Sequence, residues 1–245
     1  MLNCNNFSEA WSLMGTLINN TMKKILTLCL FLVAAAGFSQ RIIDKEVGDF
    51  HEIKVFDLIE VNLIKSDENR IFIKGENVDE IKFVNKDGVL KLRMQLDKKF
   101  QGEDTLIEVY YTDLEIIDGN EGARIVANEL VKQDRIEVRA QEGASIRLGL
   151  EVKNIDIRAV TGGIVEASGI ATNQFVVINT GGIVEARELK TEEASVKISA
   201  GGEAELFVSE KVDINVKAGG DVYVYGNPRE VNKNTFAGGR IYIQD

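Results

Sequence analysis

The sequence predicts an all-β protein, a right-handed parallel β-solenoid in which coils of nearly equal length stack on one another. Two observations predict it: a glycine-containing pair that returns every 18 to 21 residues, and apolar residues that alternate on both sides of each pair. A fixed period of this size is typical of repeat arrays. The seven pairs are Gly122-Ala123, Gly143-Ala144, Gly162-Gly163, Gly181-Gly182, Gly201-Gly202, Gly219-Gly220 and Gly238-Gly239.

The flanking residues indicate one strand before and one strand after each pair. The third and fifth residues after the first glycine are apolar in all seven repeats, as in Ile146 and Leu148. The fifth and third residues before it are apolar in repeats two to six, as in Val176 and Ile178. A period of two means a strand with one buried face, and glycine suits the turn because it adopts positive φ without a Cβ clash.

The first and last repeats fit this pattern less well. Leu114 and Ile116 lie one residue out of phase in the first, and Lys233 and Thr235 replace apolar residues in the last. Terminal repeats of a solenoid are commonly atypical, since they form its ends.

Two arrangements could use this strand–turn–strand unit. In an antiparallel meander each glycine pair would close a hairpin. In a parallel solenoid each pair would be a corner between two facing sheets. The constant distance of every apolar column from its own glycine pair favours stacked coils, and parallel crossovers are usually right-handed.

The N-terminal region predicts export. Met22-Lys23-Lys24 precedes the apolar run Ile25–Ala36, and Gly37-Phe38-Ser39-Gln40 follows it. This is the order of a signal peptide at residues 22–39, and the run is too short to span a bilayer. We therefore expect residues 1–21 to be a mis-assigned upstream extension. We expect the mature protein to reside in the periplasm, on the outer-membrane surface or outside the cell, and to have no transmembrane span.

Composition excludes several kinds of chemistry. Both cysteines, Cys4 and Cys29, precede the expected mature start, and His51 is the only histidine. Disulfides, thiolate catalysis and Cys/His zinc sites are therefore not expected in the mature chain, and we expect no cofactor. The mature chain has about 27 basic and 38 acidic residues, a balance that repels nucleic acid.

Residues 40–113 are also β-rich but lack the glycine period, whereas residues 114–245 carry the repeats. The segment Phe83–Leu90 reads as a hairpin with an Asp87-Gly88 turn, and Asp97–Asp104 reads as a polar loop. With no proline-rich or glycine-rich linker between the two parts, we expect one continuous body in which the first part caps or extends the solenoid.

The sequence resembles the head GIN domain family, the putative auto-transporter adhesin head domain common in secreted proteins of the Bacteroidetes. The resemblance covers roughly Phe50 to Asp245. It rests on Phe50-His51-Glu52-Ile53-Lys54-Val55, on the strand Leu106–Leu114 and on the series of glycine corners. It implies a fold like that of pectin-lyase-type β-helices, without an established catalytic set, and a role in adhesion at the cell envelope. The family commonly has Gly-Ser-Gly corners, where this chain has Gly-Gly.

One outward-facing column is a candidate binding site. The fourth residue after each first glycine gives Val126, Arg147, Glu166, Glu185, Glu205, Tyr223 and Tyr242. Stacked glutamates repel one another and attract cations, and tyrosine rings can stack on sugars. The column therefore suggests a divalent-cation or glycan site at Glu166, Glu185, Glu205, Tyr223 and Tyr242, while a plain solvated acidic stripe is the simpler reading.

A second outward set is apolar and suggests self-association, a partner contact or cover by a loop. Its members are Val160, Ile164, Val177 and Ile183.

We expect a non-catalytic binding or adhesion protein with a glycan or cell-surface partner. The alternatives are a carbohydrate-active enzyme, either a polysaccharide lyase or a glycosidase, on the same scaffold, and a purely structural envelope component. A glycosidase needs two carboxyl groups at a set spacing, which stacked glutamates could imitate.

Overall fold

The computed structural model describes residues 41–75, 78–95, 97 and 105–244. All the described residues belong to one compact unit, which begins at Arg41. The predicted upstream extension (1–21) and signal peptide (22–39) lie outside the described residues, as does most of the polar loop expected at 97–104. No helix among the residues described is both long and apolar enough to cross a bilayer.

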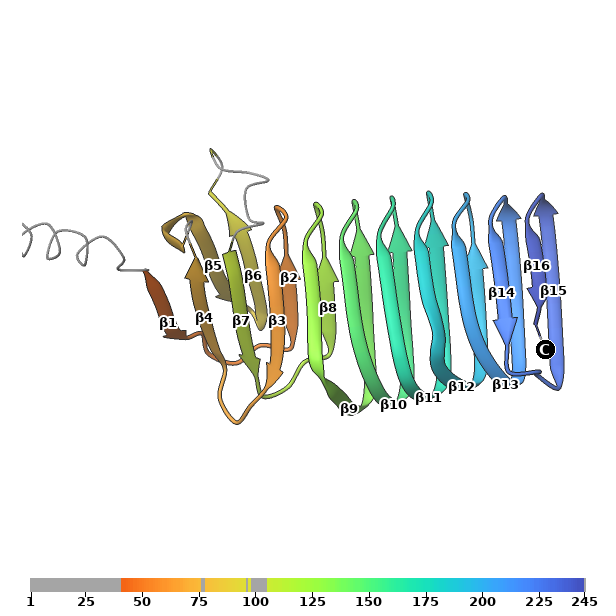
Figure 1. Ribbon diagram of the computed structural model, residues 1–245, viewed down its shortest axis with the longest axis horizontal. Helices are drawn as coiled ribbons and strands as arrows, with labels where there is room; N and C mark the ends of the chain where they lie inside the picture. Colours follow the sequence, from red (N-terminus) through yellow and green to blue (C-terminus); the bar gives the residue numbers. More distant parts are fainter. Residues whose placement is uncertain (1–40, 76–77, 96, 98–104, 245) are drawn as a thin grey trace, which may run out of the picture. The chain divides into compact units, whose positions relative to one another are not determined.

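Five long strands form the regular part of the fold. They are β9 (Arg124–Gln141), β10 (Ser145–Val160), β11 (Ile164–Asn179), β12 (Ile183–Ile198) and β13 (Glu203–Ala218). Each pairs in parallel with the strand before and after it, and each bends midway, so that its two halves lie in two facing sheets (Figure 1). This confirms the parallel β-solenoid and excludes an antiparallel meander for the repeats.

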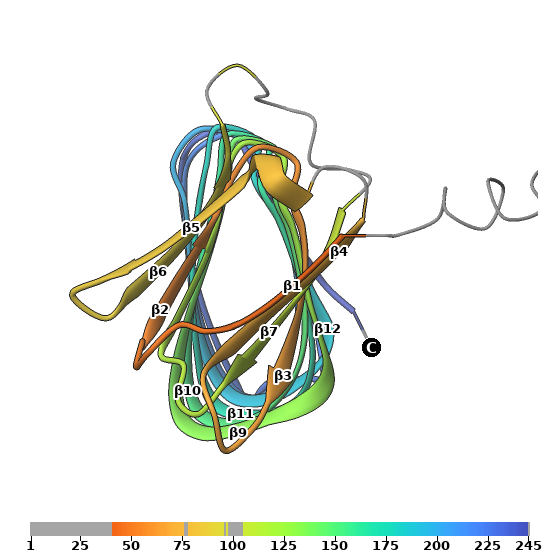
Figure 2. The same ribbon diagram turned by 90° about the vertical axis from the view of Figure 1, so that its left-hand side faces the viewer.

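The coils wind in the right-handed sense. Seen from the N-terminal end, the chain runs along β2 (Glu52–Val55) on one side, crosses at the corner to β3 (Glu60–Lys65) and returns on the other side (Figure 2). The path is clockwise and moves away from the viewer as the coils progress, which makes the coil right-handed, as expected for parallel crossovers. We call the sheet that contains β3 the first sheet and the sheet that contains β2 the second.

The N-terminal part adds coils in an order that differs from the sequence. The β2–β3 coil lies between the coil of β6 (Val89–Met94) and β7 (Thr105–Tyr111) and the coil formed by β8 (Ile116–Gly119) and the start of β9. This follows from the pairing, because β2 contacts both β6 and β8 while β3 contacts both β7 and β9.

Antiparallel strands close the N-terminal end. β4 (Arg70–Gly75) runs antiparallel to β7, and β1 (Ile42–Glu46) runs antiparallel to β4. After the short 3₁₀-helix η1 (Val78–Glu80), β5 (Ile81–Lys86) forms the expected hairpin with β6, and its turn residues Asp87 and Gly88 both have positive φ. The N-terminal part thus extends the solenoid and also covers its edge, which would otherwise offer free strand hydrogen bonds.

The solenoid ends in a coil of shorter strands. β14 (Asp221–Tyr225) and β16 (Arg240–Ile243) continue the first sheet, and β15 (Glu230–Ala237) continues the second by pairing with β13. The inward positions of β15 include Lys233 and Thr235, both exposed, so the polar residues found there in the sequence lie at the end of the core.

The glycine corners of the first four repeats are type I′ turns. At one of them Thr161 and Gly162 have φ of 50° and 72°, and the Gly163 N–H donates to the Val160 carbonyl at 3.0 Å. The sequence pattern placed the positive φ within the glycine pair, yet in these corners it begins one residue earlier. In the last three repeats both glycines of the pair have positive φ.

The second residue of each pair is small because the coil before it lies very close. A Cβ added to Gly163 would lie 2.1 Å from the Ala140 carbonyl oxygen. At Ala144 the preceding coil leaves room for a methyl group, because its neighbouring inward residue is Gly119, which has no Cβ. A Cβ added to Gly119 would lie 3.2 Å from the Cβ of Ala144. In the first four repeats, where the second residue of the pair does not have positive φ, steric room therefore decides between glycine and alanine.

One hydrophobic core runs through residues 41–244, formed by the alternate inward side chains of both sheets. The first repeat corrects the sequence analysis. Ile117 and Gly119, and not the out-of-phase Leu114 and Ile116, occupy its inward positions, because they pair with Val138 and Ala140 of β9. The first repeat is thus in phase, and glycine in one of its columns concealed the pattern.

Candidate functional site

The predicted column forms a continuous row on the outer face of the first sheet. Strand register places its members directly beside one another on successive coils, in the order Val126, Arg147, Glu166, Glu185, Glu205, Tyr223 and Tyr242. We call the part from Glu166 to Tyr242 the Glu–Tyr row. Sequence positions about one repeat apart thus become neighbours about 4.8 Å apart, the ordinary spacing of paired strands.

The three glutamates are not equivalent. Glu166 is neutralised by its neighbour, because the Arg147 Nε donates to its carboxylate at 2.6 Å. In the described part of the chain no hydrogen bond or ion pair engages the carboxylates of Glu185 and Glu205. All three line a groove of about 270 Å³ together with Arg187 and Glu188. The row therefore presents two free acidic groups within a partly enclosed polar surface.

The two tyrosines stack on each other. The ring centroids of Tyr223 and Tyr242 are 4.9 Å apart, and the ring planes are inclined by 11°. Desolvation, followed by the charges of Asp221 and Glu203, raises the pKa of Tyr223. Each ring covers one face of the other, so a sugar can stack only on the ring faces that remain.

The cation hypothesis has a geometric limit. Nowhere in the described ranges do three or more His, Cys, Asp or Glu side chains approach closely enough to hold a metal ion. A cation at this surface would therefore need Glu185 and Glu205 to change rotamer, together with water or ligand oxygens, because calcium takes six to eight oxygen ligands.

The four apolar residues of the second predicted site lie on two different sheets. Ile164 and Ile183 are neighbours just after their corners in the first sheet. Val160 and Val177 precede corners in the second sheet, where Val177 is paired with Arg158 and Lys197. Val177 is 41% exposed. Ile164 and Ile183 thus form a pair, whereas Val160 and Val177 lie on adjacent strands without being paired with each other. The four residues do not form one patch on a single face, and their role in self-association stays a prediction.

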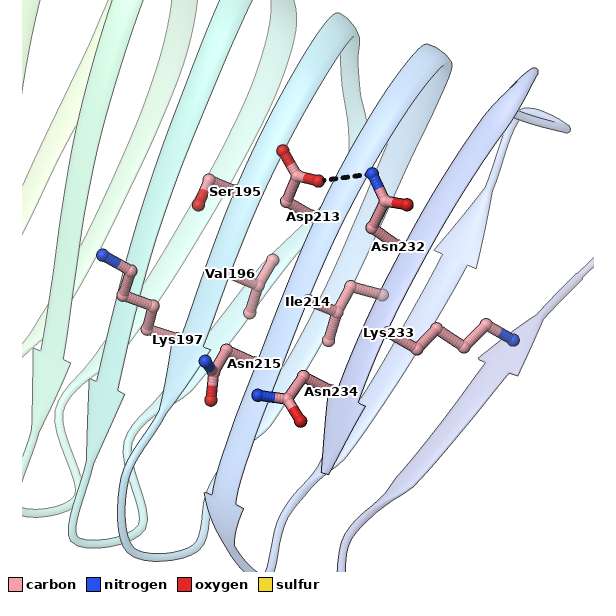
Figure 3. Close-up of a pocket in the computed structure, with 9 residues that line it drawn as sticks. All are labelled: Ser195, Val196, Lys197, Asp213, Ile214, Asn215, Asn232, Lys233 and Asn234. Atoms are coloured by element: carbon pink, nitrogen blue, oxygen red, sulfur yellow. Dashed lines mark hydrogen bonds between the residues drawn. The ribbon is translucent and has the colours of Figure 1, made fainter. Parts of the chain in front are cut away.

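The structure shows a groove that the sequence analysis did not find. It lies on the outer face of the second sheet and has a volume of about 280 Å³ (Figure 3). Two rows of side chains border it, namely Ser195, Asp213 and Asn232 in one and Lys197, Asn215 and Asn234 in the other. These are the sixth and fourth residues before three successive glycine pairs, so the same counting could have found them.

A third cluster of polar residues has a structural explanation. The Lys54 ammonium contacts Glu52 at 2.9 Å and Asp118 at 3.2 Å, and Arg139 lies 3.5 Å from Glu52. Desolvation opposes the charge of Lys54, but hydrogen bonds to Glu52 and Asp118 outweigh it and raise the Lys54 pKa. The ion pairs join β2, β8 and β9 across the second sheet and hold three coils together.

The family comparison agrees with the fold. The family model described as "Putative auto-transporter adhesin, head GIN domain" matches residues 49–228, which is most of the chain. The chain belongs to this family. No curated protein matches it.

Solved structures share the architecture of the family. A putative adhesin from Bacteroides fragilis NCTC 9343 matches with a TM-score of 0.78 at 17% identity, covering 84% of this chain and 97% of that one. A putative adhesin from Parabacteroides distasonis ATCC 8503 matches with a TM-score of 0.70 at 17% identity, over 85% and 98% of the two chains. A protein from the same organism described as a putative lipid binding protein matches at 0.65 and 14%, again over 85% and 98%. At these identities the likeness shows the fold.

Proposed function

We propose that this protein is exported and acts as a non-catalytic binding or adhesion protein of the cell envelope, with the Glu–Tyr row as its ligand surface. The observation that carries the proposal is the strand register, which aligns Glu166, Glu185, Glu205, Tyr223 and Tyr242 without a gap along one face. Membership of an adhesin family supports the same role.

A row of this kind suits a repeating or extended ligand. Each coil adds one side chain at a fixed spacing, and parallel strand pairing holds the coils, so the backbone that carries the row is pre-organised, while the unpaired side chains of Glu185 and Glu205 become ordered on binding. The free carboxylates of Glu185 and Glu205 can accept hydrogen bonds from sugar hydroxyls or share a cation. The tyrosine pair at the end of the row offers an aromatic surface with hydroxyl groups.

The test compares two charge-matched variants of strand β12. Glu185→Gln removes a free carboxylate from the row, and Glu192→Gln removes an exposed one outside it. Binding to a glycan array and to fixed bacterial cells should fall for Glu185→Gln and stay unchanged for Glu192→Gln. Equal behaviour of the two variants would refute the assignment of the ligand surface to this row.

A calcium titration separates the two ligand classes. If the row holds a cation, calcium at about ten times its dissociation constant adds roughly 1.4 kcal/mol of stability, which raises Tm by about 3–6 °C in a domain of this size. That increase should disappear in Glu185→Gln. A Tm that calcium does not move, combined with retained glycan binding, assigns the row to the glycan directly.

The rival function is carbohydrate cleavage at the same glutamates. It predicts release of reducing ends or unsaturated products from acidic polysaccharides, lost in Glu185→Ala. Turnover with that dependence would overturn the non-catalytic proposal, whereas binding without turnover agrees with it.

A further inference from the structure

The groove on the second sheet has the build of a second ligand site. Its two rows of polar side chains come from the same three coils, and the strand backbone between the rows forms the floor (Figure 3). Asp213 is paired with both Ser195 and Asn232, and Asn215 is paired with both Lys197 and Asn234. The groove is therefore two side chains wide and at least three coils long.

One row is fixed and the other is free. The Asn232 amide donates to Asp213 at 2.8 Å and to Glu230 at 2.8 Å, which holds the upper row of Figure 3 in place. Across the groove, no side-chain hydrogen bond or ion pair to any described residue engages Lys197, Asn215 or Asn234. Two amides and an ammonium thus have their hydrogen-bonding capacity available to a ligand.

An exposed aromatic ring extends the fixed row by one coil. Phe175 is paired with Ser195 and is 46% exposed. It borders a smaller hollow of about 70 Å³, which shares Ser195 and Asp213 with the main groove. A phenyl ring that remains half exposed beside polar side chains provides an apolar platform at one end of the groove.

The charge of the groove differs from that of the whole protein. The Lys233 side chain points away from the two rows, so Lys197 and Asp213 are the charged side chains that border the groove (Figure 3). Asp213 accepts a hydrogen bond from Asn232, which leaves the Lys197 ammonium as the unpaired charge there, in a chain of net charge −10. An unpaired ammonium attracts anionic groups to this part of an otherwise acidic surface.

We propose that this groove binds a linear oligosaccharide that carries carboxylates. Coils spaced by about 4.8 Å present one amide each, at a repeat comparable to the length of one hexose unit in an extended chain. Asn215 and Asn234 hydrogen-bond successive sugars, Lys197 binds a sugar carboxylate, and the apolar face of a further ring stacks on Phe175. The site lies on the opposite sheet from the Glu–Tyr row and does not depend on it.

The probes are a linear oligogalacturonate and its methyl ester, which have the same length and shape but differ in charge. With residues 40–245, the predicted mature chain, calorimetry should show binding of the acid and about tenfold weaker binding of the ester, a difference of about 1.4 kcal/mol. Stronger or equal binding of the ester would overturn the assignment of an acidic ligand. Absence of binding by both probes would overturn the site for this class of sugar.

Three variants test the residues. Asn215→Ala and Phe175→Ala should each weaken binding of the acid about tenfold, and Lys197→Met should remove the preference for the acid over the ester. Phe175→Tyr keeps the ring and should retain binding, and circular dichroism must show that every variant is folded. Glu192→Gln, which lies outside the groove and outside the Glu–Tyr row, is the matched control and should retain binding. Glu185→Gln tests the Glu–Tyr row. Loss of binding in Glu185→Gln with retention in Asn215→Ala would assign the sugar to that row and refute the groove.

A peptide is the competing occupant. An acidic peptide of equal charge and length should not displace the oligogalacturonate. If it does so at comparable concentration, recognition rests on charge alone and the sugar-specific proposal is wrong.

Discussion

The core of the solenoid contains a buried amide that should reduce its stability. Gln174 occupies an inward position of β11 between Ile155 and Ala194 of the neighbouring coils and is 0% exposed. Neither its Oε1 nor its Nε2 makes a hydrogen bond to any residue that the structure describes. A buried amide without partners costs about 1–3 kcal/mol in mutational data, because it has lost its bonds to water.

We therefore expect Gln174→Met to stabilise the protein. Methionine has nearly the same length and adapts to irregular gaps, so the substitution removes the unpaired polar atoms without leaving a cavity. The expected gain in unfolding free energy is about 1–3 kcal/mol, measured by urea denaturation with an unchanged slope. In a domain of this size each kcal/mol raises Tm by about 2–4 °C.

Thr191 supplies the control of opposite sign. It is also buried, at 3% exposure, but its hydroxyl donates to the Phe207 carbonyl at 2.6 Å. Thr191→Val has nearly the same shape and should destabilise by about 0.5–1.5 kcal/mol, since it removes that hydrogen bond. If Gln174→Met destabilises as Thr191→Val does, the amide has a bonding partner such as a buried water and the reasoning fails.

Three further predictions follow from corners, ion pairs and surface. In thermal melts, Gly163→Ala should destabilise the protein more than Gly162→Ala. The Cβ added at Gly163 clashes with backbone atoms of the preceding coil. The Cβ added at Gly162 meets no atom within 4 Å, so that substitution costs only about 1–2 kcal/mol for the positive φ. The Arg240 Nε donates to Asp221 at 2.7 Å, and this hydrogen bond lowers the Asp221 pKa below its unfolded value. The ion pair therefore stabilises β16 at pH values above the unfolded pKa of Asp221, and this stabilisation is lost as pH falls through the lower folded pKa. Below the folded pKa, amide hydrogen exchange in β16 should become faster relative to exchange in β10. In Asp221→Asn this pH dependence should disappear. If the apolar residues at the corners mediate self-association, Ile183→Lys should lower the solution mass of the wild-type oligomer in light scattering, and a monomeric wild type would contradict that contact.

The sequence was sufficient to predict the repeat architecture, because the signals that define it are local. Apolar pairs such as Val176 and Ile178 keep a fixed distance from the next glycine, so the strand faces, the corners and the register of stacked coils follow from counting. The Glu–Tyr row was found by the same counting, and strand register confirms that its five residues are neighbours.

Only the tertiary structure decided features that depend on contacts between distant segments. The β2–β3 coil lies between two coils that follow it in sequence, a pairing that no local period encodes. Whether a corner has glycine or alanine depends on the coil before it, as the pair Gly119 and Ala144 shows. The paired state of Glu166 and the free amides of Asn215 and Asn234 likewise depend on side-chain geometry across coils. Sequence periodicity fixes which residues share a column, whereas the neighbours of each column, and hence its charge and free hydrogen-bonding groups, are set by packing in three dimensions.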